Sequence, residues 1–263
     1  MFNLNFTICL LTLNKLLPIL RTNCILLHLK KLNTTFLAKK INNLRASLKL
    51  TSLKILKLFE DRANDELIRK LVESNASVPT IYEYIVGLAW YYISDDSYNL
   101  YDSFNLSMNA DFRPETHAAG GEGDIVINYS NDILMLEVTL MNKQAQKRGE
   151  WEPVLRHTAN LIIDSAPKKV RTLFIADELD PNTINIWRAI AGVPMHSSQS
   201  KKADLVANNI TIMPIKNEEL YTFLKKDISS KLLIKQISSS FEKLNQDFDE
   251  SWRDKILNTV INC

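Results

Sequence analysis

The segment GGEGDIVINYSNDILMLEVTLMNKQAQKRGEWEPVLRH, residues 120–157, constrains the fold of this chain more than any other stretch. Two runs within it, DIVINY and ILMLEVTL, are apolar or alternate between apolar and polar residues, as β-strands do. Ser130, Asn131 and Asp132 separate the two runs and are typical turn residues. A helix is expected to follow over roughly residues 150 to 165. The segment therefore predicts a β-hairpin that leads into a helix.

Two carboxylates of this hairpin are expected to converge. Glu137 lies between apolar neighbours in the second strand, where a charge is costly to bury unless it is paired or binds a cation. A turn at 130–132 pairs residues whose numbers sum to about 262, and Asp124 and Glu137 come within one of that value. Because adjacent strands lie about 4.8 Å apart, both carboxylates can reach one ion, and such hard oxygen ligands suit magnesium. The alternative is that Asp124 caps a loop while Glu137 lies on a solvated edge.

Three further residues are candidates for the same site. Glu150 and His157 are seven residues apart, which is two helical turns, so they share a face if the helix begins by about residue 149. Glu83 is the single charge in the apolar run TIYEYIVGLAWYYI. The structural alternatives are an ordinary surface or core histidine, an ion pair between Glu152 and Arg156, and burial of Glu83 against tyrosine hydroxyls or an arginine.

The order of the expected elements indicates a mixed α/β fold, with a mixed sheet flanked by helices. A buried helix begins near Pro79, and residues 95–123 are rich in loop signals. After the hairpin and its helix come the strand VRTLFIA, the helix PNTINIWRAIAG, the strand ITIMPI and the helix NEELYTFLKKD. The stretch KQISSSFEKLNQDFDESWRDKILN predicts one amphipathic C-terminal helix, with an apolar face formed by Ile237, Phe241, Leu244, Phe248 and Trp252.

The first 59 residues have an unusual charge distribution. They contain ten of the 32 lysine and arginine residues and none of the 30 acidic residues. The remaining 204 residues therefore carry a net charge of −8, which gives them no overall positive field to hold DNA phosphates. We expect residues 1–76 to be a basic, leucine-rich helical arm or a poorly ordered leader, and residues 77–263 to be the main domain.

The location of the protein can be inferred from the same features. Charged residues and a proline interrupt the N-terminal apolar stretch, so no window of about 18 apolar residues remains. We therefore expect no stable membrane association, with a membrane anchor as the minor alternative. The three cysteines form no CxxC pair and no disulfide framework, which is typical of the reducing cytoplasm.

Four blocks of the sequence together resemble the cleavage domain of AlwI-type type IIS restriction endonucleases, a family that includes nicking enzymes and small catalytic subunits. The blocks are PTIYEY, GGEGDI, the strand LMLEVTL and GEWEPVLRH, and they agree in order and spacing over about residues 77–225. The resemblance implies a PD-(D/E)XK nuclease core, with a helical N-terminal arm and helices at the C-terminus. It also implies that Asp124 and Glu137 bind Mg²⁺, for which Mn²⁺ should substitute, and that Glu83, Glu150 and His157 are active-site residues, with Glu83 and Glu150 as further candidate metal ligands.

The sequence departs from the wider PD-(D/E)XK pattern at one position. Thr139 stands two residues after Glu137, where the superfamily has a lysine, and a threonine supplies no charge to the attacking water. Orientation or deprotonation of that water must then come from His157, or from a second metal held through Glu150. The cations at Lys143, Lys147 and Arg148 could contact scissile-strand phosphates, or they could be a solvated loop.

The resemblance implies that the chain is the catalytic subunit or cleavage domain of a type IIS restriction or nicking endonuclease. Full-length members carry a DNA-recognition region ahead of the cleavage domain, and no DNA-reading pattern precedes residue 77 here. We therefore expect double-stranded DNA as substrate, a DNA-recognition subunit or a missing recognition domain, and a cognate methyltransferase in the same system. The alternatives are a catalytically inactive, partner-binding remnant and a repair-type nuclease of the same superfold.

Overall fold

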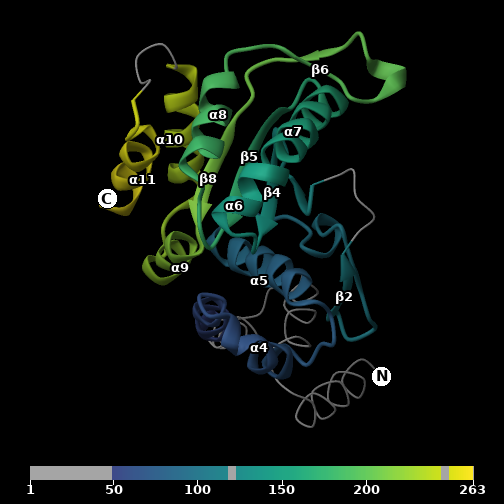
Figure 1. The fold of residues 1–263 in the computed structure, drawn as a ribbon, viewed down its shortest axis with the longest axis vertical. Coiled ribbons are helices and arrows are strands. Elements are labelled where there is room, and N and C mark those ends of the chain that lie inside the picture. Colours follow the sequence, from purple (N-terminus) through teal and green to yellow (C-terminus); the bar gives the residue numbers. More distant parts are fainter. Residues whose placement is uncertain (1–48, 118–122, 244–248, 263) are drawn as a thin grey trace, which may run out of the picture.

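The computed structural model describes residues 49–117, 123–243 and 249–262. Its central feature is a four-stranded mixed sheet in the order β3 (Ile125–Asn128), β4 (Asp132–Thr139), β5 (Lys169–Ala176) and β8 (Ile212–Lys216). β3 and β4 pair antiparallel, whereas β4, β5 and β8 run parallel. The expected fold class, a mixed sheet flanked by helices, is therefore confirmed (Figure 1).

The hairpin of β3 and β4 has the register that the sequence predicted to within one residue. Ile125 pairs with Leu136, so the next position outward places Asp124 opposite Glu137. The turn closes where the backbone N–H of Tyr129 donates to the carbonyl oxygen of Asp132 at 2.9 Å. Because side chains alternate along a strand, this register decides which face of the sheet receives each carboxylate.

The two faces of the sheet pack against different helices. Leu134, Leu136 and Val138 of β4 belong to the same buried cluster as α5 (Val78–Ile93). On the other face, Phe174 of β5 packs with residues of α7 (Trp151–Ser165) and α8 (Pro181–Ile190). Strand alternation therefore directs Glu137 toward the α7 face. Figure 1 shows α9 (Asn217–Lys226), α10 (Ser230–Glu242) and α11 (Trp252–Ile261) gathered beyond β8.

Helix α5 is the buried helix that the sequence predicted. Its N-cap is Ser77, whose hydroxyl accepts the backbone N–H of Thr80 at 3.3 Å, and Pro79 occupies the first turn. Nearly every side chain of the helix is buried, which an all-round apolar sequence requires. At its C-terminal end, Trp90 Nε1 donates to the Tyr129 hydroxyl at 3.1 Å, which joins α5 to the hairpin turn.

Part of the basic N-terminal region lies within the described structure and packs on α5. Residues 49–58 are helical, and η1 (Arg62–Asn64) and α4 (Asp65–Val72) follow, as the expected amphipathic pattern requires. Ile55, Leu56 and Phe59 are buried in the α5 cluster, with the Phe59 and Tyr82 rings 4.7 Å apart. The apolar stretch that raised the membrane alternative lies outside the described residues. Among those that are described, no helix is long and apolar enough to cross a bilayer.

Several elements differ from the sequence-based expectation. The stretch expected to form one C-terminal helix forms two, α10 and α11. A turn precedes α11, and in it the Asp249 carboxylate accepts the backbone N–H of Ser251 at 2.7 Å. Leu244 and Phe248 of the expected apolar face lie outside the described residues. The loop-rich region contains η2 (Tyr101–Ser103) and a small ribbon of β1 (Leu106–Met108) and β2 (Pro114–His117).

Further short elements complete the described fold. A second ribbon of β6 (Met195–His196) and β7 (Val206–Ala207), with η3 (Ser200–Lys202) between its strands, extends beyond the end of α7 (Figure 1). Residues 143–149 form α6 (Lys143–Gly149) rather than a loop. The strands of these two ribbons have two to four residues and no sustained apolar alternation in their sequences, so the period-two pattern did not reveal them.

Candidate active site

Asp124 and Glu137 lie opposite each other on the α7 face of the hairpin. The backbone N–H of Val138 donates to Asp124 Oδ2 at 2.8 Å and fixes this carboxylate against β4. Glu137 lies in the interior of β4 and is only 7% exposed, although its side chain carries a carboxylate. Gly123 allows the two strands to approach, because a Cβ there would collide with Met135 Sδ and lie 3.3 Å from Glu137 Oε1. The convergence that the sequence predicted for this pair therefore agrees with the structure.

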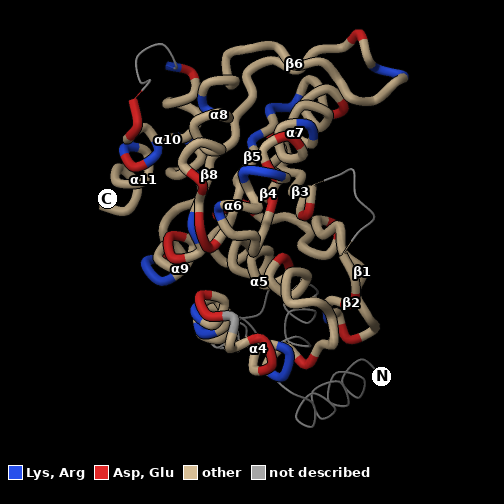
Figure 2. Tube along the Cα trace, in the orientation of Figure 1, with Lys and Arg blue, Asp and Glu red and all other residues tan. Residues whose placement is uncertain are grey.

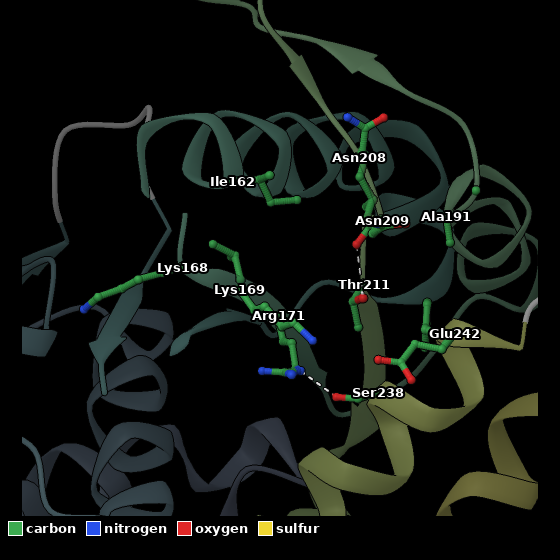
Figure 3. A pocket seen from close by; sticks show the side chains of 14 residues that line it. Ile162, Lys168, Lys169, Arg171, Ala191, Asn208, Asn209, Thr211, Ser238 and Glu242 are labelled. Carbon is green, nitrogen blue, oxygen red and sulfur yellow. Dashed lines mark hydrogen bonds between the residues drawn. The ribbon is translucent and has the colours of Figure 1, made fainter. Parts of the chain in front are cut away.

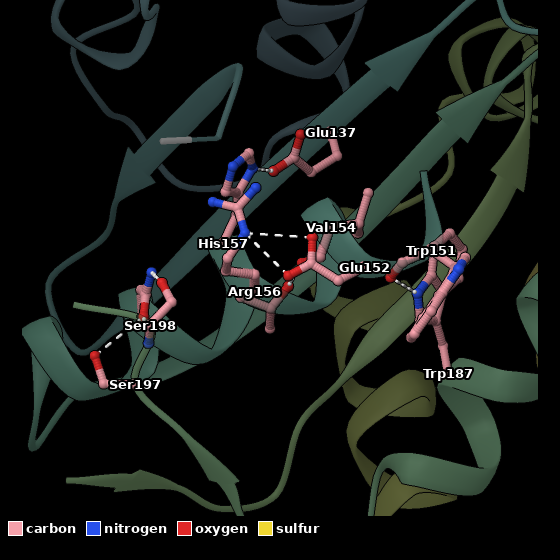
Figure 4. A network of polar contacts seen from close by, with 11 residues as sticks. Glu137, Trp151, Glu152, Val154, Arg156, His157, Trp187, Ser197 and Ser198 are labelled. Carbon is pink, nitrogen blue, oxygen red and sulfur yellow. Dashed lines mark hydrogen bonds and ion pairs between the residues drawn. The ribbon is translucent and has the colours of Figure 1, made fainter. Parts of the chain in front are cut away.

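His157 reaches the same point from α7. Its Nδ1 lies 2.9 Å from Glu137 Oε1, as Figure 4 shows. Burial and the nearby charge of Arg156 lower the pKa of His157, and burial together with Glu150 raises the pKa of Glu137 well above its usual value. Both shifts favour the uncharged forms, and a neutral His157 can make this contact as a hydrogen bond through Nδ1.

Glu150 lies at the junction of α6 and α7, immediately before His157's helix begins. It is the N-cap of α7, and its carbonyl oxygen accepts the N–H of Val154 at 3.2 Å. Thr139 donates a side-chain hydrogen bond to its carboxylate, which partly offsets the burial that raises the pKa of Glu150. The threonine that replaces the expected lysine is therefore a hydrogen-bonding partner of another site residue.

Glu83 approaches the cluster from α5. It is half-buried on an otherwise apolar helix, and burial with the negative charge of Asp124 raises its pKa to about 8. The same causes, burial first and Glu137 second, raise the pKa of Asp124 to about 8. All five residues predicted from sequence are thus electrostatically coupled. We call Glu83, Asp124, Glu137, Glu150 and His157 the carboxylate cluster.

The chemistry of the carboxylate cluster fits a divalent cation. The pKa values of Glu83, Asp124 and Glu137 are each raised by neighbouring carboxylates, so these groups repel each other when ionised, and a bound cation would remove this repulsion. Within the described residues, no three or more His, Cys, Asp or Glu side chains form a set that could by itself hold a metal ion. Magnesium does not require one, because it keeps several waters and binds through one or two carboxylates together with substrate phosphates.

Helix α6 carries three cations and has Glu150 as its C-cap. Lys143, Lys147 and Arg148 are exposed and give this helix its basic positions in Figure 2. The helix is held in place by Gln146, which is fully buried. Its Nε2 donates to the carbonyl oxygens of Met141 at 2.7 Å and Glu178 at 2.6 Å, and its Oε1 accepts the N–H of Asp180 at 3.1 Å. Sequence reasoning missed Gln146, since a glutamine among polar residues gives no signal of burial.

A cavity elsewhere in the molecule does not compete with this site. It has a volume of about 590 Å³ and lies at the amino end of β5, lined in part by Lys168, Lys169 and Arg171 (Figure 3). Arg171 is already paired, with Ser238 Oγ at 2.6 Å and Asp132 Oδ1 at 3.0 Å. Lys168 Nζ donates to the Tyr129 carbonyl oxygen at 3.1 Å. The cations of this cavity are therefore largely occupied within the fold.

A family model matches this chain, and a solved structure is similar to it. The family model described as AlwI restriction endonuclease matches residues 13–223, a range that begins well before the expected residue 77. The structure is similar to the small subunit (R.BspD6I2) of the heterodimeric restriction endonuclease R.BspD6I. The TM-score is 0.53 and the identity 16%, covering 79% of this chain and 98% of that one, so this likeness concerns the fold. None of the curated proteins matches the chain.

Proposed function

The chain belongs to the AlwI restriction endonuclease family, and on that premise we propose that it is a magnesium-dependent DNA endonuclease whose active site is the carboxylate cluster. The observation that carries the proposal is the joining of Asp124, Glu137 and His157 across two strands and a helix. Burying such groups together is costly, and a catalytic metal site gives a reason for the cost.

The reaction is the hydrolysis of a phosphodiester bond by an in-line water. The water oxygen bonds to phosphorus, the bond from phosphorus to one sugar oxygen breaks, and that sugar oxygen takes up a proton. A magnesium ion held by Asp124 and Glu137, with Glu83 and Glu150 as further candidate ligands, would polarise the phosphate and lower the pKa of the water. Manganese is expected to replace magnesium, since it too prefers oxygen ligands.

We assign the proton handling to His157 and Glu150, because Thr139 carries no charge. With its proton on Nδ1, His157 donates to Glu137 and keeps that carboxylate in one orientation. Its Nε2 is then the nitrogen that can accept the proton of the attacking water. Glu150, held by Thr139, helps to position the water.

We propose that a second polypeptide delivers the DNA. The chain after residue 59 carries a net charge of −8, so the cations of α6 can position a few phosphates but cannot grip a duplex unaided. The structurally similar protein, R.BspD6I2, is the small subunit of a heterodimeric restriction endonuclease. A catalytic subunit of a type IIS or nicking system, with a DNA-recognition partner and a cognate methyltransferase, accounts for both observations.

The proposal is tested with the full chain, combined with any DNA-binding subunit that a neighbouring gene encodes, on plasmid DNA in Mg²⁺. Asp124→Ala and Glu137→Ala should each abolish cleavage and keep cooperative thermal unfolding. Glu242→Ala, at the opposite end of the sheet, is the matched control and should cleave like the wild type. Wild-type cleavage by either site variant would refute the site. No cleavage by the wild type in Mg²⁺ or Mn²⁺ would favour the inactive, partner-binding alternative.

A further inference from the structure

We propose that Arg156 is a further catalytic residue, whose guanidinium binds the scissile phosphate and supplies the positive charge that Thr139 does not. This inference rests on the proposed function, because it assigns a phosphate contact within the same site. The sequence alone indicated only that Arg156 could form an ion pair with Glu152 on the helix surface. The structure adds the direction in which the rest of the guanidinium points.

Within the described residues, the Arg156 guanidinium is hydrogen-bonded through its Nε alone. Its Nε lies 3.1 Å from Glu152 Oε1 and 3.4 Å from Glu152 Oε2, a contact between residues four apart on α7. Within the described part of the chain, no protein atom accepts a hydrogen bond from its two terminal nitrogens. The side chain is 32% exposed, so a substrate can reach these nitrogens from solvent. Four N–H groups are therefore available in a fixed, planar arrangement.

The free end of Arg156 faces the carboxylate cluster. Figure 4 shows its guanidinium beside the His157 ring and below the Glu137 carboxylate. The positive charge of Arg156 lowers the pKa of His157 and opposes the rise in the pKa of Glu137 that burial and Glu150 cause, so the charge lies within electrostatic reach of the cluster. Lys143, Lys147 and Arg148 lie on α6 and are not among the causes that shift the pKa of any cluster residue. Arg156 is thus the cation that the described structure couples to this site.

A guanidinium at this position has a defined chemical task. As the water oxygen bonds to phosphorus and the sugar oxygen departs, negative charge is spread over the two non-bridging phosphate oxygens. Paired N–H donors match the spacing of two phosphate oxygens, and Glu152 keeps the fork oriented before substrate arrives. The guanidinium neither gains nor loses a proton in the reaction. It differs in this respect from His157, which accepts the proton of the water.

The test compares Arg156→Ala and Arg156→Lys with Arg69→Ala in the full chain with its recognition partner. Arg69 forms the same kind of exposed helical ion pair, with Glu66 at 2.7 Å on α4, and is a matched control. Under single-turnover conditions, Arg156→Ala should cleave about 10²–10³-fold more slowly, as for loss of one transition-state donor. Arg156→Lys should recover part of the rate, and added guanidinium should partly rescue Arg156→Ala but not Asp124→Ala.

A second measurement does not depend on cleavage. Binding of a short DNA duplex by the full chain with its recognition partner is measured in Ca²⁺ over a range of salt concentrations. Arg156→Ala should reduce the slope of log affinity against log salt by about 0.9, the value for one lost phosphate contact, whereas Arg69→Ala should not. Thermal unfolding should be affected equally little by both changes.

The outcomes separate this inference from the proposed function. If the wild type cleaves, Asp124→Ala does not, and Arg156→Ala cleaves at the wild-type rate with an unchanged salt slope, Arg156 is only a surface ion-pair partner and the inference is overturned. A slow Arg156→Ala variant that guanidinium does not rescue and whose salt slope is unchanged also overturns it. If the wild type neither binds nor cleaves DNA, the proposed function fails and the inference fails with it.

Discussion

The substitution Asp124→Asn should stabilise the metal-free protein while it abolishes cleavage. In the folded chain, burial and the neighbouring carboxylates raise the pKa of Asp124 from 3.8 to about 8. The folded state therefore holds this proton more tightly than the unfolded state does. The contribution of Asp124 to stability is therefore most favourable below pH 3.8, falls as pH rises between 3.8 and about 8, and is fully lost above pH 8.

The magnitude follows from the size of the pKa change. A carboxyl group whose pKa rises from 3.8 to about 8 costs roughly 6 kcal/mol of folding free energy once it is ionised. Asp124 is half-buried, so solvent screens its charge, and Glu83 can hold a proton when Asp124 is ionised. Both effects reduce the cost, and we expect about 2–4 kcal/mol. Asparagine keeps an oxygen for the Val138 N–H, so it removes the charge without removing the hydrogen bond.

The assay is urea unfolding of the wild type and the Asp124→Asn variant in EDTA, from pH 5 to pH 8.5. The stability difference should be small at pH 5 and should grow toward pH 8. Magnesium should then stabilise the wild type, by about 2.7 kcal/mol at a hundredfold excess over its dissociation constant, and the variant far less. A variant that is less stable than the wild type at pH 8, or that gains as much from magnesium, would refute the electrostatic reasoning.

Three further perturbations test the packing around the site and the attachment of α10. Gln146→Leu should cost about 2–4 kcal/mol in urea unfolding, since it leaves the buried N–H of Asp180 without its partner; a loss no larger than that of an exposed glutamine variant would contradict this. Gly123→Ala should cost about 1–3 kcal/mol and slow cleavage, because the new Cβ collides with buried Met135; calorimetry and single-turnover rates that match the wild type would disprove the close approach. Burial alone would raise the pKa of Asp95, but hydrogen bonds from the Lys231 N–H and the Ser229 and Ser230 hydroxyls lower this pKa. Asp95→Asn should therefore destabilise the protein at pH 7 and have less effect as the pH falls below 3.8. An equal loss of stability at pH 2.5 would count against this reasoning.

The hairpin and its carboxylates could be predicted from sequence because local rules determine them. A short turn fixes the register, and the period of two fixes the face, so the placement of Asp124 opposite Glu137 follows from counting residues. The buried helix α5 followed in the same way from its all-round apolar sequence. The charge at Glu83 stood out against that background, which is why its place in the site could be anticipated.

The remaining features depend on tertiary contacts that no local pattern records. Gln146 bridges α6 and the loop after β5, and only the packing of those two segments identifies it. The end of α10 was missed because apolar residues continue at helical spacing past Phe241, whereas the turn at Asp249 is set by side-chain hydrogen bonds. The direction of Arg156 likewise depends on how α7 lies against β4.

The position of a bound cation tests the central claim most directly. Crystals of the full chain soaked in Mn²⁺ and measured at the manganese absorption edge would give an anomalous difference peak at each bound ion. We predict a peak between the carboxylates of Asp124 and Glu137, and its loss in Glu137→Ala. A peak elsewhere in the chain, or none at the carboxylate cluster under conditions in which Mn²⁺ supports DNA cleavage, would contradict the proposed active site.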